Sequence, residues 1–293
     1  LSKNQLKKLR KKQEWEAKAP ERKARRKEQK HRKKERDRAA REAGEQSKES
    51  DRSKKPPGQQ VPITCIVDCN FDSLMTENEI VSLAGQLTRC YSENKNARFR
   101  AHLAVSSFNG RLKERFDTVL SKNYKSWRGF RTFDDDFVQV AERARTWMQV
   151  KDLENLRSAL SKPAEADATN DTSKEQAEVV YLSSDSDVTL TELKAGVTYV
   201  IGGLVDRNRH KGICHKHAMD RNVKTAKLPI GEYIKMSSRQ VLTTNHVLEI
   251  MLRWLESGDW AKAFMEVIPK RKGGVLLPED DDAADGQGDG ING

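Results

Sequence analysis

Apolar positions divide the chain into a polar arm, a patterned central region and a polar tail. Residues 3–43 are rich in Lys, Arg, Glu and Ala with few large apolar residues, which predicts a helix that is charged on all sides. Residues 44–60 are typical of a linker, so residues 1–60 form an arm. We expect residues 61–270 to fold as one domain and residues 271–293 to be a disordered acidic tail.

Strand and helix patterns alternate through residues 62–268. Short apolar runs predict strands from 63 to about 68, at 101–108, from 178, at 197–201 and at 226–230. Helical spacing predicts helices after Thr76, at 109–120, 134–150, from 189 to 193, at 243–256 and at 258–267. Thr76 and Glu79 form a capping-box pattern. Five strands alternating with helices predict an α/β sandwich with a mostly parallel sheet.

Charge is concentrated in the arm. The chain has a formal net charge of +11, and residues 1–60 carry 23 Lys and Arg against 10 Asp and Glu. Such an arm is typical of proteins that bind an anionic polymer, although a solvated charged helix is the simpler alternative. No apolar run approaches 18 residues, so we expect no transmembrane helix. The N-terminus has no signal-peptide pattern, and because the sequence starts at Leu1, targeting by earlier residues stays open.

Several common enzyme classes lack their motifs here. The sequence has no GxGxxG after a first strand, no GxxxxGK[ST] and no GxSxG. These absences argue against a standard Rossmann enzyme, a P-loop NTPase and an α/β-hydrolase. Four irregularly spaced cysteines favour a reducing compartment.

Residues 210–217 contain several residue types that bind metal ions. His210, Cys214, His215 and His217 follow one another closely, but their spacing fits no usual zinc arrangement. If this segment is helical, His210 and Cys214 share one face and the other two point elsewhere. We therefore interpret it as a charged helix surface with one or two residues facing a cleft, and predict no metal.

Two strand ends and one helix start carry the chemistry of a ligand cleft. Gly202-Gly203 end one strand and are followed by Asp206, Pro229-Ile230-Gly231 end another, and Thr243-Thr244-Asn245 open a helix. In α/β proteins, ligands bind at the carboxyl ends of strands. A plain turn would also explain the two glycines.

These segments together resemble a known family. IGGLVDRNRHKGICHKHA, KLPIGEYI and VLTTNHVLEIMLRW resemble the SPOUT-class tRNA methyltransferases that modify N1 of the purine at position nine. VDCNFDSLMTENEIVSLAGQLTRCYSENK and LSKNQLKKLRKKQEWE are also similar to that family. The resemblance covers nearly the whole chain except 48–60, 161–177 and the acidic tail.

The resemblance implies a SPOUT-type trefoil-knotted sandwich that binds S-adenosyl-L-methionine in a bent form through three loops. Backbone contacts in the knot would explain the missing glycine fingerprint. The implied cofactor-binding residues are Leu182, Gly202, Gly203, Asp206, Arg207, Asn208, Arg209, His210, Lys211, Cys214, Leu228, Gln240, Val241, Leu242 and Thr244. Leu182 and Leu228 could equally be ordinary core residues.

Asp206 is the predicted catalytic residue. N1 of neutral guanine carries a proton that must leave during methylation, and a positioned carboxylate can accept it. The alternative is a structural Asp that caps the loop or pairs with Arg207 or Arg209. Adenine at the same position is a second substrate candidate, because its N1 lone pair needs no base for attack.

The predicted partner is tRNA, with no membrane and a monomeric state as the resemblance implies. Predicted RNA contacts, besides the arm, are Gln86, Arg89, Lys95, Arg98 and Arg100. A non-catalytic tRNA-binding subunit, or more weakly a nucleolar or ribosomal factor, is the alternative function. We expect a location in nucleus and cytoplasm, with mitochondria left open.

Overall fold

The computed structural model describes residues 2–42, 58–149, 160, 178–235, 241–268 and 275–276. The chain divides into two compact units, Leu1–Pro57 and Gly58–Gly293, and each is described by itself. Residues 44–57 of the predicted linker (44–60), residues 161–177 and most of the acidic tail lie outside the described residues.

The first unit consists of two charged helices, α1 (Lys3–Ala17) and α2 (Ala19–Glu42). Ion pairs one turn apart support them, such as Arg10–Glu14 at 3.1 Å and Arg32–Glu28 at 3.2 Å. The sequence predicts one continuous helix, but the structure breaks it at Lys18. Pro20 explains the break, because proline lacks an amide hydrogen and its ring clashes with the preceding turn.

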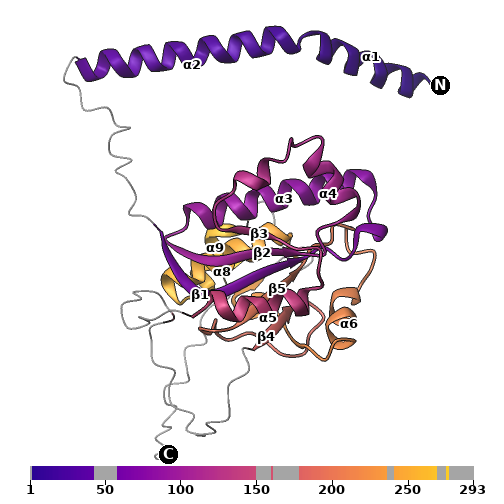
Figure 1. The fold of residues 1–293 in the computed structure, drawn as a ribbon, viewed down its shortest axis with the longest axis vertical. Coiled ribbons are helices and arrows are strands. Elements are labelled where there is room, and N and C mark those ends of the chain that lie inside the picture. The colour runs from indigo at the N-terminus through magenta and orange to yellow at the C-terminus, as the bar shows by residue number, and fades with distance from the viewer. Residues whose placement is uncertain are drawn as a thin grey trace, which may run out of the picture. The chain divides into compact units, whose positions relative to one another are not determined.

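The second unit is built on a six-stranded sheet with the order β3-β2-β1-β5-β4-β6 (Figure 1). Its strands are β1 (Gln59–Asp68), β2 (Phe99–Ser106), β3 (Phe130–Thr132), β4 (Val179–Leu182), β5 (Thr198–Gly202) and β6 (Lys224–Ala226). Every pairing in this sheet is parallel. The carboxyl ends of the strands therefore meet at one edge, where the predicted cleft residues lie.

Helices cover both faces of the sheet (Figure 1). One face packs against α3 (Glu77–Asn96), α4 (Gly110–Asp117), α8 (Thr244–Ser257) and α9 (Trp260–Val267), and the other against α5 (Phe137–Trp147) and α6 (Ile213–Met219). The alternation of side chains along the strands accounts for the two cores. In β1, for example, Cys65 and Val67 face the first layer and Ile66 faces the second.

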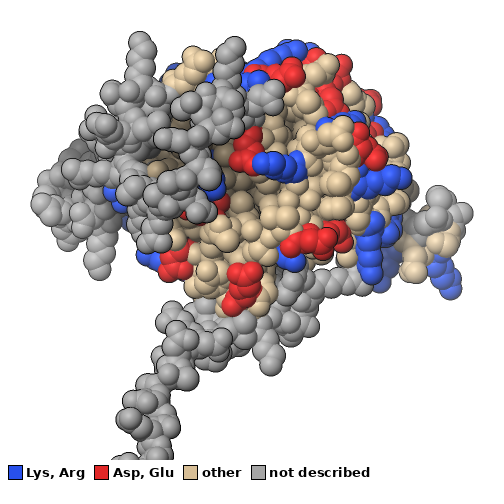
Figure 2. All heavy atoms as spheres, turned by 90° about the horizontal axis from the view of Figure 1, so that it is seen from below, with Lys and Arg blue, Asp and Glu red and all other residues tan. Residues whose placement is uncertain are grey.

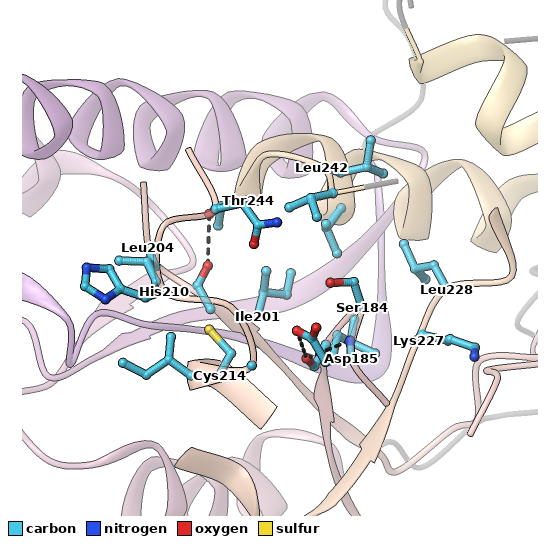
Figure 3. A pocket seen from close by; sticks show the side chains of 18 of the residues that line it. Ser184, Asp185, Ile201, Leu204, His210, Cys214, Lys227, Leu228, Leu242 and Thr244 are labelled. Carbon is cyan, nitrogen blue, oxygen red and sulfur yellow. Dashed lines mark hydrogen bonds between the residues drawn. The ribbon is translucent and has the colours of Figure 1, made fainter. Parts of the chain in front are cut away.

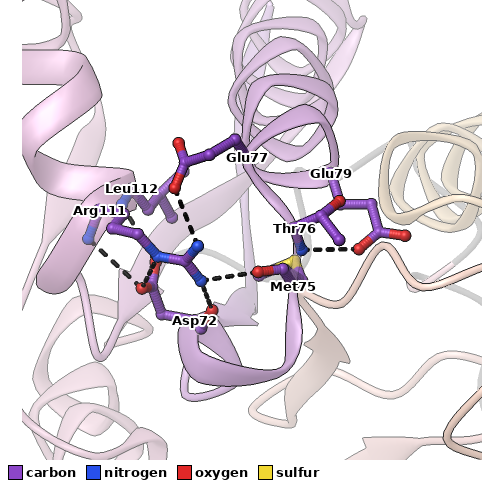
Figure 4. Close-up of polar contacts among 7 residues, drawn as sticks. All are labelled: Asp72, Met75, Thr76, Glu77, Glu79, Arg111 and Leu112. Carbon is purple, nitrogen blue, oxygen red and sulfur yellow. Dashed lines mark hydrogen bonds and ion pairs between the residues drawn. The ribbon is translucent and has the colours of Figure 1, made fainter.

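A polar network joins the starts of α3 and α4 (Figure 4). The guanidinium of Arg111 binds the Asp72 carboxylate at 3.0 Å, Glu77 at 3.0 Å and the Met75 carbonyl at 2.7 Å. The predicted capping box is present, since Glu79 accepts a hydrogen bond from the Thr76 amide at 2.8 Å. These bonds fix the turn η1 (Asp72–Leu74), which follows the carboxyl end of β1.

Most predicted elements are found, with three corrections. The sequence predicts five strands, but the sheet has a sixth, β3, which is three residues long and half-buried throughout. The predicted helix from 189 to 193 is absent, because Thr189 bridges Lys227 and the Leu190 amide binds the Lys227 carbonyl. The predicted strand 226–230 ends at Ala226, and Ile230 instead begins α7 (Ile230–Tyr233).

A short antiparallel pair of strands, β7 (Ile234–Lys235) and β8 (Val275–Leu276), lies outside the main sheet. All four cysteines are free thiols. No helix in the described part of the chain has the length and apolarity needed to cross a bilayer.

Candidate functional site

A pocket lies at the carboxyl ends of β4, β5 and β6, where α8 begins (Figure 3). Its cavity has a volume of about 170 Å³. Ten of the predicted cofactor residues line it, namely Leu182, Gly202, Asp206, Asn208, His210, Cys214, Leu228, Val241, Leu242 and Thr244. Three segments that are far apart in the sequence thus form one site.

Gly202 and Cys214 form adjoining parts of the pocket wall. A Cβ atom on Gly202 would lie 2.6 Å from the Cys214 Sγ and 3.6 Å from the Tyr181 hydroxyl. A side chain at this position would therefore force the Cys214 thiol to turn away or α6 to move off β5. Burial raises the pKa of Cys214 to about 12, so its thiol stays protonated and is no nucleophile at neutral pH.

Gly203 does not line the pocket but packs against the end of β1. Its amide donates to the Asp68 carbonyl at 2.7 Å, and an added Cβ would lie 2.7 Å from the same oxygen. The sequence pointed to close approach between this glycine and a ligand. The structure shows close approach to a neighbouring strand instead.

A buried polar cluster lies behind Gly202 and Gly203. The carboxylate of Asp68, which is fully buried, accepts from the Tyr181 hydroxyl at 3.0 Å and from the Asn70 amide at 3.2 Å. Nε2 of His217 is 3.2 Å from Asp68, within ion-pair distance, but the ring N–H direction does not make a hydrogen bond. Burial holds the pKa of Tyr181 well above its usual range, so it remains a hydrogen-bond donor to Asp68.

Asp206 organises the loop that follows β5. It is 7% exposed, and its two carboxylate oxygens accept from the backbone amides of Asn208 at 2.8 Å and His210 at 2.7 Å. These bonds hold Arg207 and Asn208 at φ values of 54° and 63°. Nothing in the described residues pairs Asp206 with Arg207 or Arg209, so its structural role is to bind the loop backbone.

The other predicted residues of this loop point elsewhere. Arg209 pairs with Glu79 at 2.7 Å and binds the Leu74 carbonyl at 3.3 Å, which ties the loop to the start of α3. Arg207 and Lys211 do not line the pocket, and Lys211 is exposed. The sequence suggested a helix from His210 onward, but α6 begins only at Ile213, and His210 lies in the preceding turn.

The third segment is held by a bond from α3. Thr244, the first residue of α8, donates its amide to Gln86 Oε1 at 3.1 Å and its hydroxyl to the Gly202 carbonyl at 3.1 Å. Gln86, a predicted RNA contact, is 5% exposed, and its role toward RNA stays a prediction. Its side chain caps α8 and ties that helix to α3. Gln240 lies outside the described residues.

The remaining predicted RNA contacts differ in their surroundings. Arg89, Lys95 and Arg98 are exposed, and Arg98 lies 5.2 Å from the Phe99 ring centroid. Arg100 is half-buried, and its Nε donates to the Gly58 carbonyl at 2.9 Å, so it fixes the start of β1. The first three remain available to a ligand.

Some lining residues were not predicted from the sequence. They include Ser183, Ser184 and Asp185 after β4, and Lys227 after β6. The hydroxyl- and acid-rich turn after a strand was the available indication, and Asp185 adds a second carboxylate to the site. Within the part of the chain that the structure describes, no three His, Cys, Asp or Glu residues are arranged to hold a metal ion.

Comparison with known proteins gives concordant matches. The family model for tRNA (guanine(9)-N(1))-methyltransferase TRM10/TRM10A matches residues 1–273. A relative from Aspergillus fumigatus, named tRNA (guanine(9)-N1)-methyltransferase, is 53% identical over 97% of this chain and 73% of its own length. One from Schizosaccharomyces pombe with the same name is 40% identical over 96% of this chain and 82% of its own. The crystal structure of full-length spTrm10 in complex with SAH is similar with a TM-score of 0.58 and 40% identity, covering 73% of this chain and 98% of that chain.

Proposed function

The chain belongs to the TRM10/TRM10A family of tRNA (guanine(9)-N(1))-methyltransferases, and we propose that its pocket holds S-adenosylmethionine while Asp206 accepts the proton of the target guanine. Family membership assigns the reaction, which is methyl transfer from S-adenosylmethionine to N1 of guanine 9 in tRNA. The residue assignments are our proposal. The observation that carries them is that Asp206 lines the pocket with its carboxylate held in one orientation.

The pocket residues fit the methyl donor. Apolar side chains such as Ile201, Leu228 and Leu242 suit a flat adenine ring, whereas Ser183 and Asp185 suit hydroxyl and ammonium groups. A solved relative bound to SAH, the demethylated form of the donor, supports this use of the fold. When bound, S-adenosylmethionine supplies an electrophilic methyl group. The apolar walls would exclude water from the reacting atoms.

Asp206 can serve both the loop and the reaction. An ionised carboxylate has about four lone-pair sites, and the backbone amides of Asn208 and His210 use two of them. The remaining sites can accept the proton from guanine N1 as the new bond forms. Because two bonds fix the carboxylate beforehand, little reorganisation is needed when the base enters.

The Asp206→Asn variant tests this assignment. We expect the single-turnover rate at saturating tRNA and donor to fall by roughly 10²–10⁴-fold, the usual contribution of general-base catalysis. The asparagine side chain would also turn an N–H group toward one of the two backbone amides that Asp206 binds, which disturbs the loop. SAH affinity should therefore be measured by calorimetry, and it should fall far less than the rate. The rate of the variant should rise with pH more steeply than that of the wild type, since hydroxide replaces the missing base.

Asp185→Asn is the matched control, because it removes the other carboxylate of the pocket. It is expected to change donor affinity while keeping the pH dependence of the wild type. A near-normal single-turnover rate for Asp206→Asn at neutral pH would remove Asp206 from the proton transfer and leave it only its structural role.

The same proposal includes features that rest on the family and on composition. We propose a trefoil knot around the three pocket segments, a monomeric enzyme, and a location in nucleus and cytoplasm. In the sheet, β5 lies between β1 and β4, although it follows both of them in the chain. The chain therefore returns between two strands that precede it, which is compatible with a knot. The basic arm of residues 1–60 supports the RNA-binding part of the proposal.

A further inference from the structure

The segment 120–129 connects α4 with β3 and packs against the outer side of α3. The rings of Tyr91 on α3 and Trp127 stack with centroids 4.5 Å apart and planes 3° apart. Phe130 contacts Trp127 at 4.9 Å and joins this pair to the sheet. The segment is thus fixed to α3 through aromatic packing.

Its backbone is held in an unusual conformation. Ser121 and Lys122 have φ values of 51° and 55°, which residues other than glycine rarely adopt. The Lys122 amide donates to the Phe116 carbonyl at 2.8 Å, and the Tyr124 hydroxyl donates to Asp117 at 2.9 Å. Such strain persists only where surrounding contacts impose it, and it is concentrated at functional sites.

Four exposed cations lie on the same two segments as the aromatic stack. Lys122, Lys125 and Arg128 come from the segment, and Lys95 comes from α3 with its ammonium 5.7 Å from the Tyr91 centroid. We name these four residues and the stack the α3–η2 face, after α3 and the short helix η2 (Asn123–Ser126).

The cations of the α3–η2 face are not held in ion pairs within the described part of the chain. Among the described residues, none of the four forms an ion pair, and Asp117, the acid that acts on Lys122, is itself paired with Lys113. Residues 85–98 and 120–131 together contain seven Lys and Arg but only one acid, Glu93. Like charges gathered without counter-charges repel one another, and a bound polyanion would relieve that repulsion.

Several cations elsewhere on this unit are paired. Arg143 binds Asp135 at 2.9 Å, Arg221 binds Asp136 at 2.9 Å and Lys224 binds Glu178 at 2.8 Å. Figure 2 shows a different side of the molecule, where acidic and basic side chains are interspersed. The α3–η2 face differs in that four cations gather there and none of them forms an ion pair within the described residues.

We propose that the α3–η2 face binds the phosphate backbone of the substrate tRNA. Four cations, of which three lie on a constrained segment, match a polyanion, and the stacked, half-buried rings of Tyr91 and Trp127 add a surface on which bases can stack. Gln86 and Lys95 lie on the same helix, so the face is roughly 14 Å along α3 from the residue that caps the pocket. This inference rests on the proposed function and extends the binding site beyond Arg89, Lys95 and Arg98.

The test is the triple variant Lys122→Gln/Lys125→Gln/Arg128→Gln in the full chain, with tRNA affinity measured at several salt concentrations. Each lost phosphate contact should reduce the slope of log affinity against log salt by about 0.7–0.9, so three contacts reduce it by about 2–3. At about 0.15 M salt each contact is worth roughly fivefold, so the affinity should fall by up to roughly 100-fold. SAH affinity should be unchanged, because none of the three residues lines the pocket.

The matched control is Lys194→Gln/Lys224→Gln/Lys262→Gln, which removes the same charge from other exposed positions. The proposal expects this control to keep nearly the wild-type salt slope. Equal loss of slope in both variants, or wild-type tRNA affinity in the first, would overturn the proposal and favour an acidic protein as the partner of this face. If the wild-type chain does not bind SAH, the proposed function itself is refuted, so the two failures are distinguishable.

Discussion

Substituting alanine for Gly202 tests how the pocket is built. The added Cβ would lie 2.6 Å from the Cys214 Sγ, whereas unstrained carbon contacts are about 3.5–4.0 Å. Either the Cys214 side chain must then take another rotamer, or α6 or the end of β5 must move by about 1 Å. Both elements line the pocket, so the change should affect stability and donor binding together.

The magnitude follows from overpacking, which costs about 1–3 kcal/mol in a well-packed core. For a folded unit of this size, each kcal/mol lowers Tm by about 2–4 °C. We therefore expect Gly202→Ala to lower Tm by roughly 2–12 °C. Cys214→Ala removes the clashing sulfur, so the double variant should regain part of that loss, with a coupling energy of about 0.5–3 kcal/mol.

Gly203→Ala provides the contrast. Its Cβ would meet the Asp68 carbonyl oxygen at 2.7 Å and the Cys69 Sγ at 2.9 Å, so no single side-chain truncation relieves it. Denaturant unfolding and SAH calorimetry on the single and double variants give the full cycle. Wild-type stability of Gly202→Ala, or rescue of Gly203→Ala by Cys214→Ala, would refute the packing that this reasoning assumes.

Two further predictions concern the pocket cap and the arm. Gln86→Leu leaves the buried Thr244 amide without its acceptor, at a cost of about 1–3 kcal/mol, and should weaken SAH binding in calorimetry, with partial recovery in Gln86→Glu. Reduced tRNA affinity with unchanged stability and SAH affinity would instead return Gln86 to the RNA interface. Deleting residues 1–55 should lower tRNA affinity and flatten its salt dependence while SAH binding is retained. An unchanged salt slope would contradict the arm's electrostatic role.

Periodicity predicted the elements whose side chains are sorted by burial. The strands around Asp68 and Tyr199 and the helix that buries Leu83 and Leu87 were all located, because one face of each meets the core. β3 could not be found in this way, since its three residues are all half-buried. The predicted helix from 189 was displaced by pairing with Lys227, a partner far along the chain.

The candidate site was predictable where the residue type itself carries information. Glycines, an acid and a Thr-Thr-Asn turn at strand ends indicated the pocket before its shape was known. The particular partners were not predictable. Gln86 binds Thr244 across 158 positions, and Glu79 binds Arg209 across 130, so neither bond leaves a local pattern.

The pairing of β1 with β5 has a consequence for synthesis on the ribosome. Asp68 lies beside Gly202 in the sheet, roughly 130 residues later in the chain, so at 5–20 residues per second β1 waits roughly 7–25 s for that neighbour. During this interval β1 has an open apolar edge, the kind of strand that pairs wrongly with other chains. A nascent chain that stalls before β5 therefore lacks one of the strands that line the pocket. Its open β1 edge is then a site for chaperone binding.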